Sequence, residues 1–328
     1  MQKKGFQMLY TRRLYTRRDI GKLALTAVPL AALAAKPESK YGGVQVGTIS
    51  YSFREMPEPN NCEALLKHMT DLGLNGIELM NAPAETFAGS PVVQRMPAGP
   101  PPPPGAPRTG PTPLSPEQQA ALKKWRLGVS MDKYKALRKM YNDAGVDIYA
   151  FKLGLTMAMS NEEYEYTFNV AEALGANHLT MELPEDGALT KRVGEFAAKR
   201  KMYVGYHAHT QATPTLWDQA MSQSKYNGIN LDLGHYTAGT NSSPIPFLQK
   251  NHGRITSMHM KDRKYETHGG ENMPWGQGDT PIKEALQLMK KEHYTFPATI
   301  ELEYKTPAGS NVMAEMRKCV QYCKDALA

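Results

Sequence analysis

Four residues able to bind a metal ion close four successive apolar runs of this sequence: Glu182, Asp232, His259 and Glu301. The runs read HLTMELP, GINLDLGH, RITSMHMKD and FPATIELEY, and helix-like segments separate them. Parallel β/α units bring the carboxyl ends of all strands to one face, so side chains about 120 positions apart can converge there. Two Glu, one Asp and one His form an oxygen-rich set that suits Mn²⁺, Mg²⁺ or Co²⁺ better than a thiolate-type zinc site does. The sequence therefore predicts a divalent metal centre, and an enzyme is the leading interpretation.

Strand-like and helix-like runs alternate from residue 44 to residue 328. The predicted strands cover residues 44–53, 76–81, 146–153, 178–184, 202–209, 228–235, 254–262 and 296–304. Several helical runs end in glycine, as in LGLNG, NDAG and ALGA, because glycine tolerates the left-handed backbone that ends a helix. Eight strands, each followed by a helix, are typical of a single (β/α)₈ TIM barrel, which needs about 250 residues. We therefore expect an α/β barrel over residues 36–328.

An insertion after the second predicted strand, residues 91–130, breaks this rhythm. Its first part, 91–115, is dominated by Pro and Gly and cannot form a packed core. The run SPEQQAALKKWRLGV that follows predicts a short extra helix capped by Ser115. The insertion lies on the face where barrel active sites are built, so it is compatible with a lid and equally with a tolerated surface loop.

Residues 1–35 resemble a twin-arginine export signal. Arg17 and Arg18 precede an apolar run from Leu23 to Ala35 and small residues suited to cleavage. The alternative, a membrane anchor, needs about 20 apolar residues, and this run is shorter. We expect a signal segment read by the twin-arginine export machinery, and hence a periplasmic or otherwise exported protein.

Charge and cysteine content exclude some functions. The chain carries a net charge of +7, and residues 1–35 hold seven basic residues and one acid, which leaves +1 for the remainder. A nearly neutral domain gives no electrostatic case for nucleic acid as a partner. Cys62, Cys319 and Cys323 do not form a natural disulfide framework, and we expect them to be buried small residues.

Five runs carry a resemblance to a known superfamily: GYHAH, NLDLGHY, HMKDR, WGQGDTPIKEAL and IELEY. In their order they resemble the xylose isomerase-like barrels, often labelled sugar phosphate isomerases/epimerases, over roughly residues 44–325. The resemblance implies a metal held by an acid from strand four or five, an Asp from strand six, a His from strand seven and an acid from strand eight. By position these are Glu182, Asp232, His259 and Glu301. Glu303 shares a face with Glu301 and stays an alternative.

The expected chemistry is removal of a proton α to a carbonyl, the step shared by aldose–ketose isomerisation and epimerisation. A divalent ion (Mn, Mg, Co or Zn) stabilises the enediolate that forms. Glu182 and Glu301 are the expected catalytic residues, each as metal ligand and general acid/base.

A second group of residues shares the expected active face and is predicted to contact substrate. Histidines at the ends of strands five and six belong to it, and the alternative for them is a core or capping role. His207 is also a candidate fifth ligand. The predicted substrate contacts are His207, His209, His235, Lys152, Lys261 and Trp275, with Glu78 as a weaker candidate.

The leading function is a metal-dependent isomerase or epimerase acting on a small carbohydrate. The run GQGDT lacks the ending of a phosphate loop, which favours an unphosphorylated sugar. One alternative is a 3-keto-glycoside lyase, in which β-elimination follows the same proton abstraction. Another is an exported, non-catalytic carbohydrate-binding barrel. Apurinic endonuclease activity, also seen on this barrel, needs more ligands than the sequence places. The resemblance is compatible with a homo-oligomer.

Overall fold

The computed structural model describes residues 36–92 and 114–328. Eight parallel strands form a closed ring, because β11 pairs with β2 and β2 pairs with β3. The ring strands are β2 (Val44–Ile49), β3 (Gly76–Met80), β4 (Asp147–Lys152), β5 (His178–Glu182), β6 (Tyr203–His207), β7 (Asn227–Asp232), β8 (Ile255–Met260) and β11 (Ala298–Ile300). The predicted TIM barrel is confirmed.

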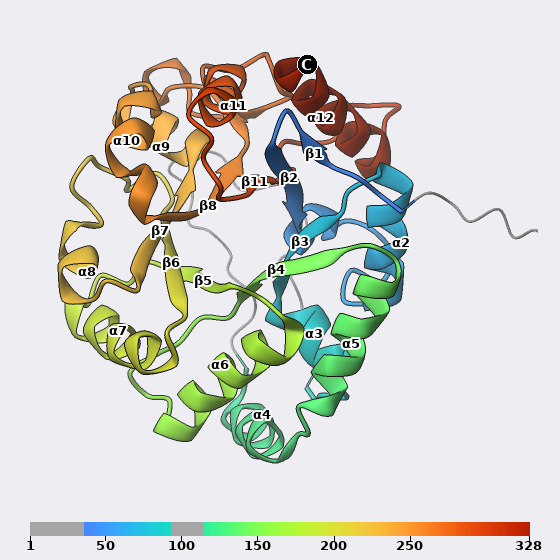
Figure 1. Ribbon diagram of the computed structural model, residues 1–328, viewed down its shortest axis with the longest axis vertical. Helices are drawn as coiled ribbons and strands as arrows, with labels where there is room; N and C mark the ends of the chain where they lie inside the picture. The colour runs from blue at the N-terminus through green and yellow to red at the C-terminus, as the bar shows by residue number, and fades with distance from the viewer. Residues whose placement is uncertain (1–35, 93–113) are drawn as a thin grey trace, which may run out of the picture. The chain divides into compact units, whose positions relative to one another are not determined.

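Helices surround the strand ring on its outside (Figure 1). They are α2 (Cys62–Leu72), α3 (Asn81–Phe87), α4 (Pro116–Gly128), α5 (Asp132–Asp143), α6 (Asn161–Leu174), α7 (Gly187–Arg200), α8 (Asp218–Gln223), α9 (Leu233–Thr240), α10 (Ile245–Asn251), α11 (Ile282–Lys291) and α12 (Val312–Leu327). Short strands β1 (Lys40–Tyr41), β9 (Asp262–Arg263) and β10 (Asn272–Met273) lie outside the ring. None of the helices in the described part of the chain is long and apolar enough to cross a bilayer.

Local sequence explains both element types. Every residue of β7 is buried, as expected for a strand covered on both faces. Helix α11 instead buries Ile282, Ala285, Leu286 and Met289, whose spacing of three and four residues forms one apolar stripe. Gly73 ends α2 with φ of 70°, in the left-handed region that the LGLNG run predicts.

All eight predicted strands end earlier in the structure, and three of these ends lie at or beside the candidate site. The first gives way to a 3₁₀ turn at Ser50–Phe53. The sixth ends at Asp232, which caps α9, so His235 lies in a helix. The eighth ends at Ile300, so Glu301 and Glu303 lie in the segment after it. The end of the sixth strand follows from capping, because the Asp232 carboxylate accepts the backbone N–H of His235 and starts a helix there.

The extra helix expected in the insertion is α4. Ser115 forms a reciprocal capping box with Gln118, in which Ser115 Oγ accepts the Gln118 N–H and the Gln118 side chain accepts the Ser115 N–H. Leu122 and Arg126 are its buried residues. The Pro-rich residues 93–113 and the predicted signal segment 1–35 lie outside the described residues, so both interpretations stay predictions.

Candidate metal centre

Four buried side chains from successive strands meet at the carboxyl end of the barrel: His207, Asp232, His259 and Glu301. Each offers one ligand atom, and these atoms all lie within 4.8 Å of one another. The register explains the convergence, because Asp232 pairs with His259 across β7 and β8, and Glu301 immediately follows β11. The structure therefore brings together three of the four predicted ligands and adds His207.

One of the two carboxylate oxygens of Asp232 accepts no hydrogen bond from the described residues. Oδ1 accepts the N–H of His235 at 2.8 Å. Oδ2 is buried and accepts no hydrogen bond from the described residues, although Lys261 Nζ lies 3.1 Å away. Burial raises the pKa of Asp232 to about 6; Lys261 opposes this shift and Glu301 adds to it. Lys261 is shared with Glu301 and Glu303, so this one ammonium group faces three buried carboxylates, and a bound metal ion would add the positive charge that they lack.

His259 lies between two carboxylates. Its Nε2 is 2.8 Å from Glu78 Oε2 and its Nδ1 is 3.0 Å from Glu301 Oε2. Burial alone would lower the pKa of His259, but Glu78 and Glu301 outweigh it and raise the pKa to about 10. The ring is thus held as an imidazolium, and coordination of a metal by this residue releases a proton. The four clustered side chains therefore fit a divalent metal once His259 has lost this proton.

A directional hydrogen-bond chain fixes the ring of His207. Asn230 Nδ2 donates to Ser257 Oγ at 2.7 Å, which leaves Asn230 Oδ1 to accept from His207 Nδ1 at 2.8 Å. Ser257 in turn donates to His178 Nε2 at 3.0 Å, and His178 Nδ1 donates to Asn177 Oδ1 at 2.6 Å. Burial lowers the pKa of His207 well below its usual value, so the ring is neutral. With the proton on Nδ1, the Nε2 lone pair is available to a metal.

Lys261 supplies the positive charge that offsets the buried carboxylates. Its Nζ lies 2.5 Å from Glu303 Oε2, 2.8 Å from Glu301 Oε2 and 3.1 Å from Asp232 Oδ2. These carboxylates outweigh burial and raise the pKa of the ammonium group. Lys261 is only 2% exposed, so it acts within the charge network of the centre rather than at its surface.

His235 is also buried beneath the site. Its Nε2 is 3.1 Å from Lys261 Nζ, and its Nδ1 is 2.7 Å from Arg263 Nη1. Burial, together with these two cations, lowers the pKa of His235 far below its usual value. The ring is therefore neutral and forms part of the support of the centre.

Glu182 lies at the rim rather than in the ligand cluster. Its Oε1 is 2.9 Å from Lys152 Nζ, and its Oε2 is 3.7 Å from His209 Nε2. The side chain is 52% exposed. Partial burial opposes the shift, but the Lys152 ammonium outweighs it and lowers the pKa of Glu182 well below its usual value. Ligation by Glu182 stays a prediction, since the structure pairs this carboxylate with two rim cations.

The WGQGDT turn is built around Asp262. Asp262 Oδ2 accepts the backbone N–H groups of Gly276, Gln277 and Gly278 at 2.7–3.1 Å. Trp275 meets Tyr322 of α12 edge-on, with ring centroids 5.6 Å apart. This contact favours the packing role of Trp275, and its predicted stacking on a sugar stays a prediction.

Asn230 contacts His207 of the cluster and Ser257 contacts Asn230, although the sequence does not single these two residues out, and Glu78, a weaker candidate, contacts His259. Asn230 and Ser257 each lie two positions before a ligand, Asp232 and His259, so they share its face of the strand. A buried polar residue with the same parity as a ligand was the available signal. Glu78 lies on β3, which carries none of the four clustered side chains, and its carboxylate contacts His259.

Comparisons with known proteins give structural likeness only. No protein-family model and no curated protein matches this chain. Among solved structures, a xylose isomerase domain protein from Planctomyces limnophilus matches with TM-score 0.58 and 14% identity, covering 87% of this chain and 96% of that one. The probable 3-DHS dehydratase AsbF from Bacillus anthracis matches with TM-score 0.59 and 14% identity, covering 85% and 98%. A 3-keto-D-glucoside 4-epimerase from E. coli matches with TM-score 0.55 and 12% identity, covering 86% and 99%. At these identities the likeness establishes the shared barrel fold.

Proposed function

We propose that this protein is a divalent-metal-dependent isomerase or epimerase that removes a proton α to a carbonyl of a sugar or sugar derivative. The observation that carries the proposal is the convergence of His207, Asp232, His259 and Glu301 around the buried Oδ2 of Asp232. The name of one structural neighbour, a 3-keto-D-glucoside 4-epimerase, supports carbohydrate chemistry of this kind.

The four clustered side chains would hold the ion through His207 Nε2, Asp232 Oδ2, His259 and Glu301. Mn²⁺, Mg²⁺, Co²⁺ and Zn²⁺ all accept this mixed set of oxygen and imidazole donors. When bound, the ion supplies positive charge that stabilises the negative charge developing on substrate oxygens. Asn230 keeps the His207 lone pair aimed at the cluster, and Lys261 offsets the remaining negative charge.

Two carboxylates are placed to move the proton. Glu182 is the last residue of β5, and Glu301 comes directly after β11. These two strands lie four positions apart in the eight-strand ring, so they face each other across the barrel. Lys152 lowers the pKa of Glu182, and Lys261 and His259 lower the pKa of Glu301 against the effect of burial, so both groups are ionised at neutral pH. A base on each side of the substrate is what epimerisation requires.

Deuterium exchange tests the reaction. The metal-loaded protein, and its Asp232→Ala variant as control, would be incubated in D₂O with a panel of hexoses and 3-keto-glycosides and followed by NMR. Metal-dependent exchange at the carbon next to the carbonyl, with the glycosidic bond intact, is the expected result. Release of the aglycone would identify the lyase alternative. Absence of exchange with every substrate, although a metal is bound, would leave the carbohydrate-binding alternative and contradict the proposal.

Export is a separate proposal that depends on residues 1–35. The twin-arginine pattern at Arg17 and Arg18 supports it. Cell fractionation of the full chain should find the protein outside the cytoplasm, and Arg17→Lys with Arg18→Lys should retain it inside. Equal distribution of the two forms would count against the export machinery as a partner.

A further inference from the structure

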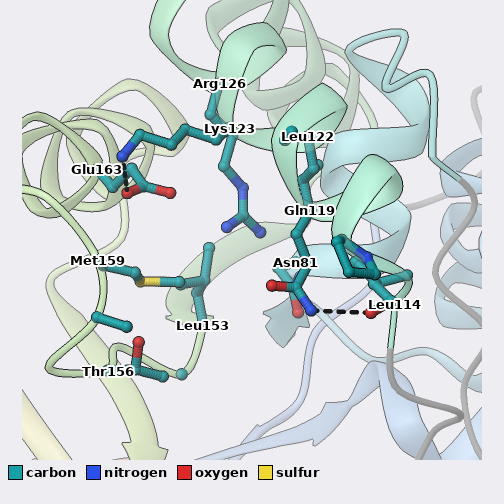
Figure 2. Close-up of a pocket in the computed structure, with 14 residues that line it drawn as sticks. Asn81, Leu114, Gln119, Leu122, Lys123, Arg126, Leu153, Thr156, Met159 and Glu163 are labelled. Atoms are coloured by element: carbon teal, nitrogen blue, oxygen red, sulfur yellow. Dashed lines mark hydrogen bonds and ion pairs between the residues drawn. The ribbon is translucent and has the colours of Figure 1, made fainter.

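A cavity of about 630 Å³ lies between the insertion helix α4 and the loop that follows β4. Figure 2 shows its lining side chains facing one another across this space. Its walls include Asn81, Gln119, Leu122, Leu153, Thr156 and Met159. The volume lies within the range of about 300–1,000 Å³ that is usual for small-molecule sites.

The cavity begins where two site strands end. Asn81 is the first residue after β3, the strand that contributes Glu78 to the metal centre. Leu153 is the first residue after β4, directly after Lys152, which pairs with Glu182 at the rim. Because β3 and β4 are neighbours in the parallel ring, the cavity and the metal centre share the carboxyl end of the barrel.

The charged groups of the cavity wall are already paired. Lys123 Nζ lies 3.3 Å from Glu163 Oε2. Arg126 binds Glu85 through two nitrogens, at 2.7 and 3.1 Å. The remaining lining is apolar apart from the amides of Asn81 and Gln119 and the Thr156 hydroxyl. Asn81 Nδ2 donates to Glu85 Oε2 and Gln119 Nε2 to the Leu114 carbonyl, so the groups left for a ligand are mainly acceptors and the hydroxyl. Such a wall suits an uncharged, mainly apolar group that makes one or two hydrogen bonds.

The helix that forms this wall is firmly anchored. Besides the ion pair to Glu85, Trp125 meets Tyr166 edge-on at 6.5 Å between ring centroids. Tyr166 OH donates to Glu85 Oε1 at 2.9 Å and is itself 2.6 Å from Tyr134 OH. The wall is therefore formed before a ligand arrives, which reduces the ordering cost of binding.

We propose that this cavity binds the aglycone of a glycoside substrate, an uncharged aryl or alkyl group attached to the sugar that reaches the metal centre. This inference rests on the proposed carbohydrate function and names its substrate class. It makes α4 a determinant of specificity, because the helix belongs to the insertion rather than to the barrel.

Two adjacent alanines of α4 provide a matched test. Ala120 lines the cavity and Ala121 does not, although both are exposed residues of the same helix. Calorimetric titration of the metal-loaded full chain would compare phenyl and methyl glycosides of glucose, galactose, mannose and allose. For at least one sugar we expect the phenyl form to bind at least roughly tenfold more tightly, as burial of an aromatic ring predicts. Ala120→Trp should abolish this preference, and Ala121→Trp should preserve it.

Several outcomes would overturn the inference. Equal binding of phenyl and methyl forms for every sugar would do so, and so would a phenyl preference that survives in Ala120→Trp. Ala158→Phe, which fills the cavity from the opposite loop, covers the case in which Ala120→Trp fails to fold. Melting temperature and metal content show that a variant is intact.

The two proposals fail in different ways. A phenyl preference lost in Ala120→Trp, without deuterium exchange in any substrate, would support the aglycone site and contradict the isomerase or epimerase. Metal-dependent exchange without any phenyl preference would support the enzyme and contradict the aglycone site.

Discussion

Glu85 and Asp232 are both buried carboxylates of this barrel, and their oxygens have very different partners. Glu85 accepts two hydrogen bonds from Arg126 and one from Tyr166. Asp232 Oδ2 accepts none from the described residues, and the neighbouring His259 carries a proton that a metal ligand must lose. Glu85 thus has an arginine of its own, whereas Asp232 shares one lysine with Glu301 and Glu303.

The difference separates structural from functional charge. In a bidentate Arg–carboxylate pair, the attraction between the two charges offsets the cost of removing them from water. Breaking the pair leaves an uncompensated buried charge. A set with an unsatisfied oxygen and strongly shifted pKa values is typical of a functional site. We therefore assign the Glu85–Arg126 pair to the anchoring of α4, and the Asp232 cluster to chemistry.

The largest expected effect comes from Asp232→Asn, which keeps the shape of the side chain and removes a ligand charge. Loss of a metal that stabilises substrate charge should lower turnover by at least about a thousandfold. The unfolding free energy of the metal-free protein should not fall, because a costly buried carboxylate is removed. Steady-state kinetics measures the turnover, and urea unfolding measures the free energy. Near-normal turnover in Asp232→Asn would contradict a functional role of the Asp232 cluster.

Glu85→Gln should show the opposite pattern. It leaves Arg126 as a buried charge without its carboxylate, so we expect a loss of about 3–5 kcal/mol in unfolding free energy. Metal content should be unchanged. The double variant Glu85→Gln, Arg126→Met should recover much of the stability, as measured by a double-mutant cycle. Metal loss in the single variant while it remains folded would mean that the two networks are coupled.

His178 gives a pH-dependent contribution of intermediate size. Burial lowers the pKa of His178 to about 4, below an unfolded value of about 6.5. Its stability contribution is therefore complete above about pH 6.5 and is lost as the pH falls through about 4, a change of about 3 kcal/mol. His178→Gln should flatten this part of the stability curve in urea unfolding between about pH 7 and about pH 4. An unchanged curve would show that His178 is not held neutral by the Ser257–Asn230–His207 chain.

The smallest expected effect identifies the fourth ligand. His207→Gln removes the oriented Nε2 and should weaken metal binding by about 10–100-fold. Glu182→Gln should lower turnover with little effect on metal affinity, because its carboxylate pairs with Lys152 outside the cluster. Competition with a chromophoric chelator measures both affinities. The reverse ranking would restore Glu182 as the ligand expected from the family resemblance.

The sequence predicts the convergence of Asp232, His259 and Glu301, because strand ends of a parallel barrel converge by topology. That these residues bind a metal stays a prediction. The sequence could not choose between Glu182 and His207, which end neighbouring strands, since that choice depends on the side-chain partners Lys152 and Asn230. It also gave no sign of the Glu85–Arg126 pair, whose members are 41 residues apart across the insertion.

Elemental analysis of protein purified without chelator tests the central claim most directly. Wild type would be compared with His259→Ala and with the double variant Glu85→Gln, Arg126→Met. If the Asp232 cluster binds a metal, we expect about one divalent ion per chain in wild type and in the double variant, and none in His259→Ala. A metal-free wild type after incubation with Mn²⁺, or equal metal content in His259→Ala, would contradict it.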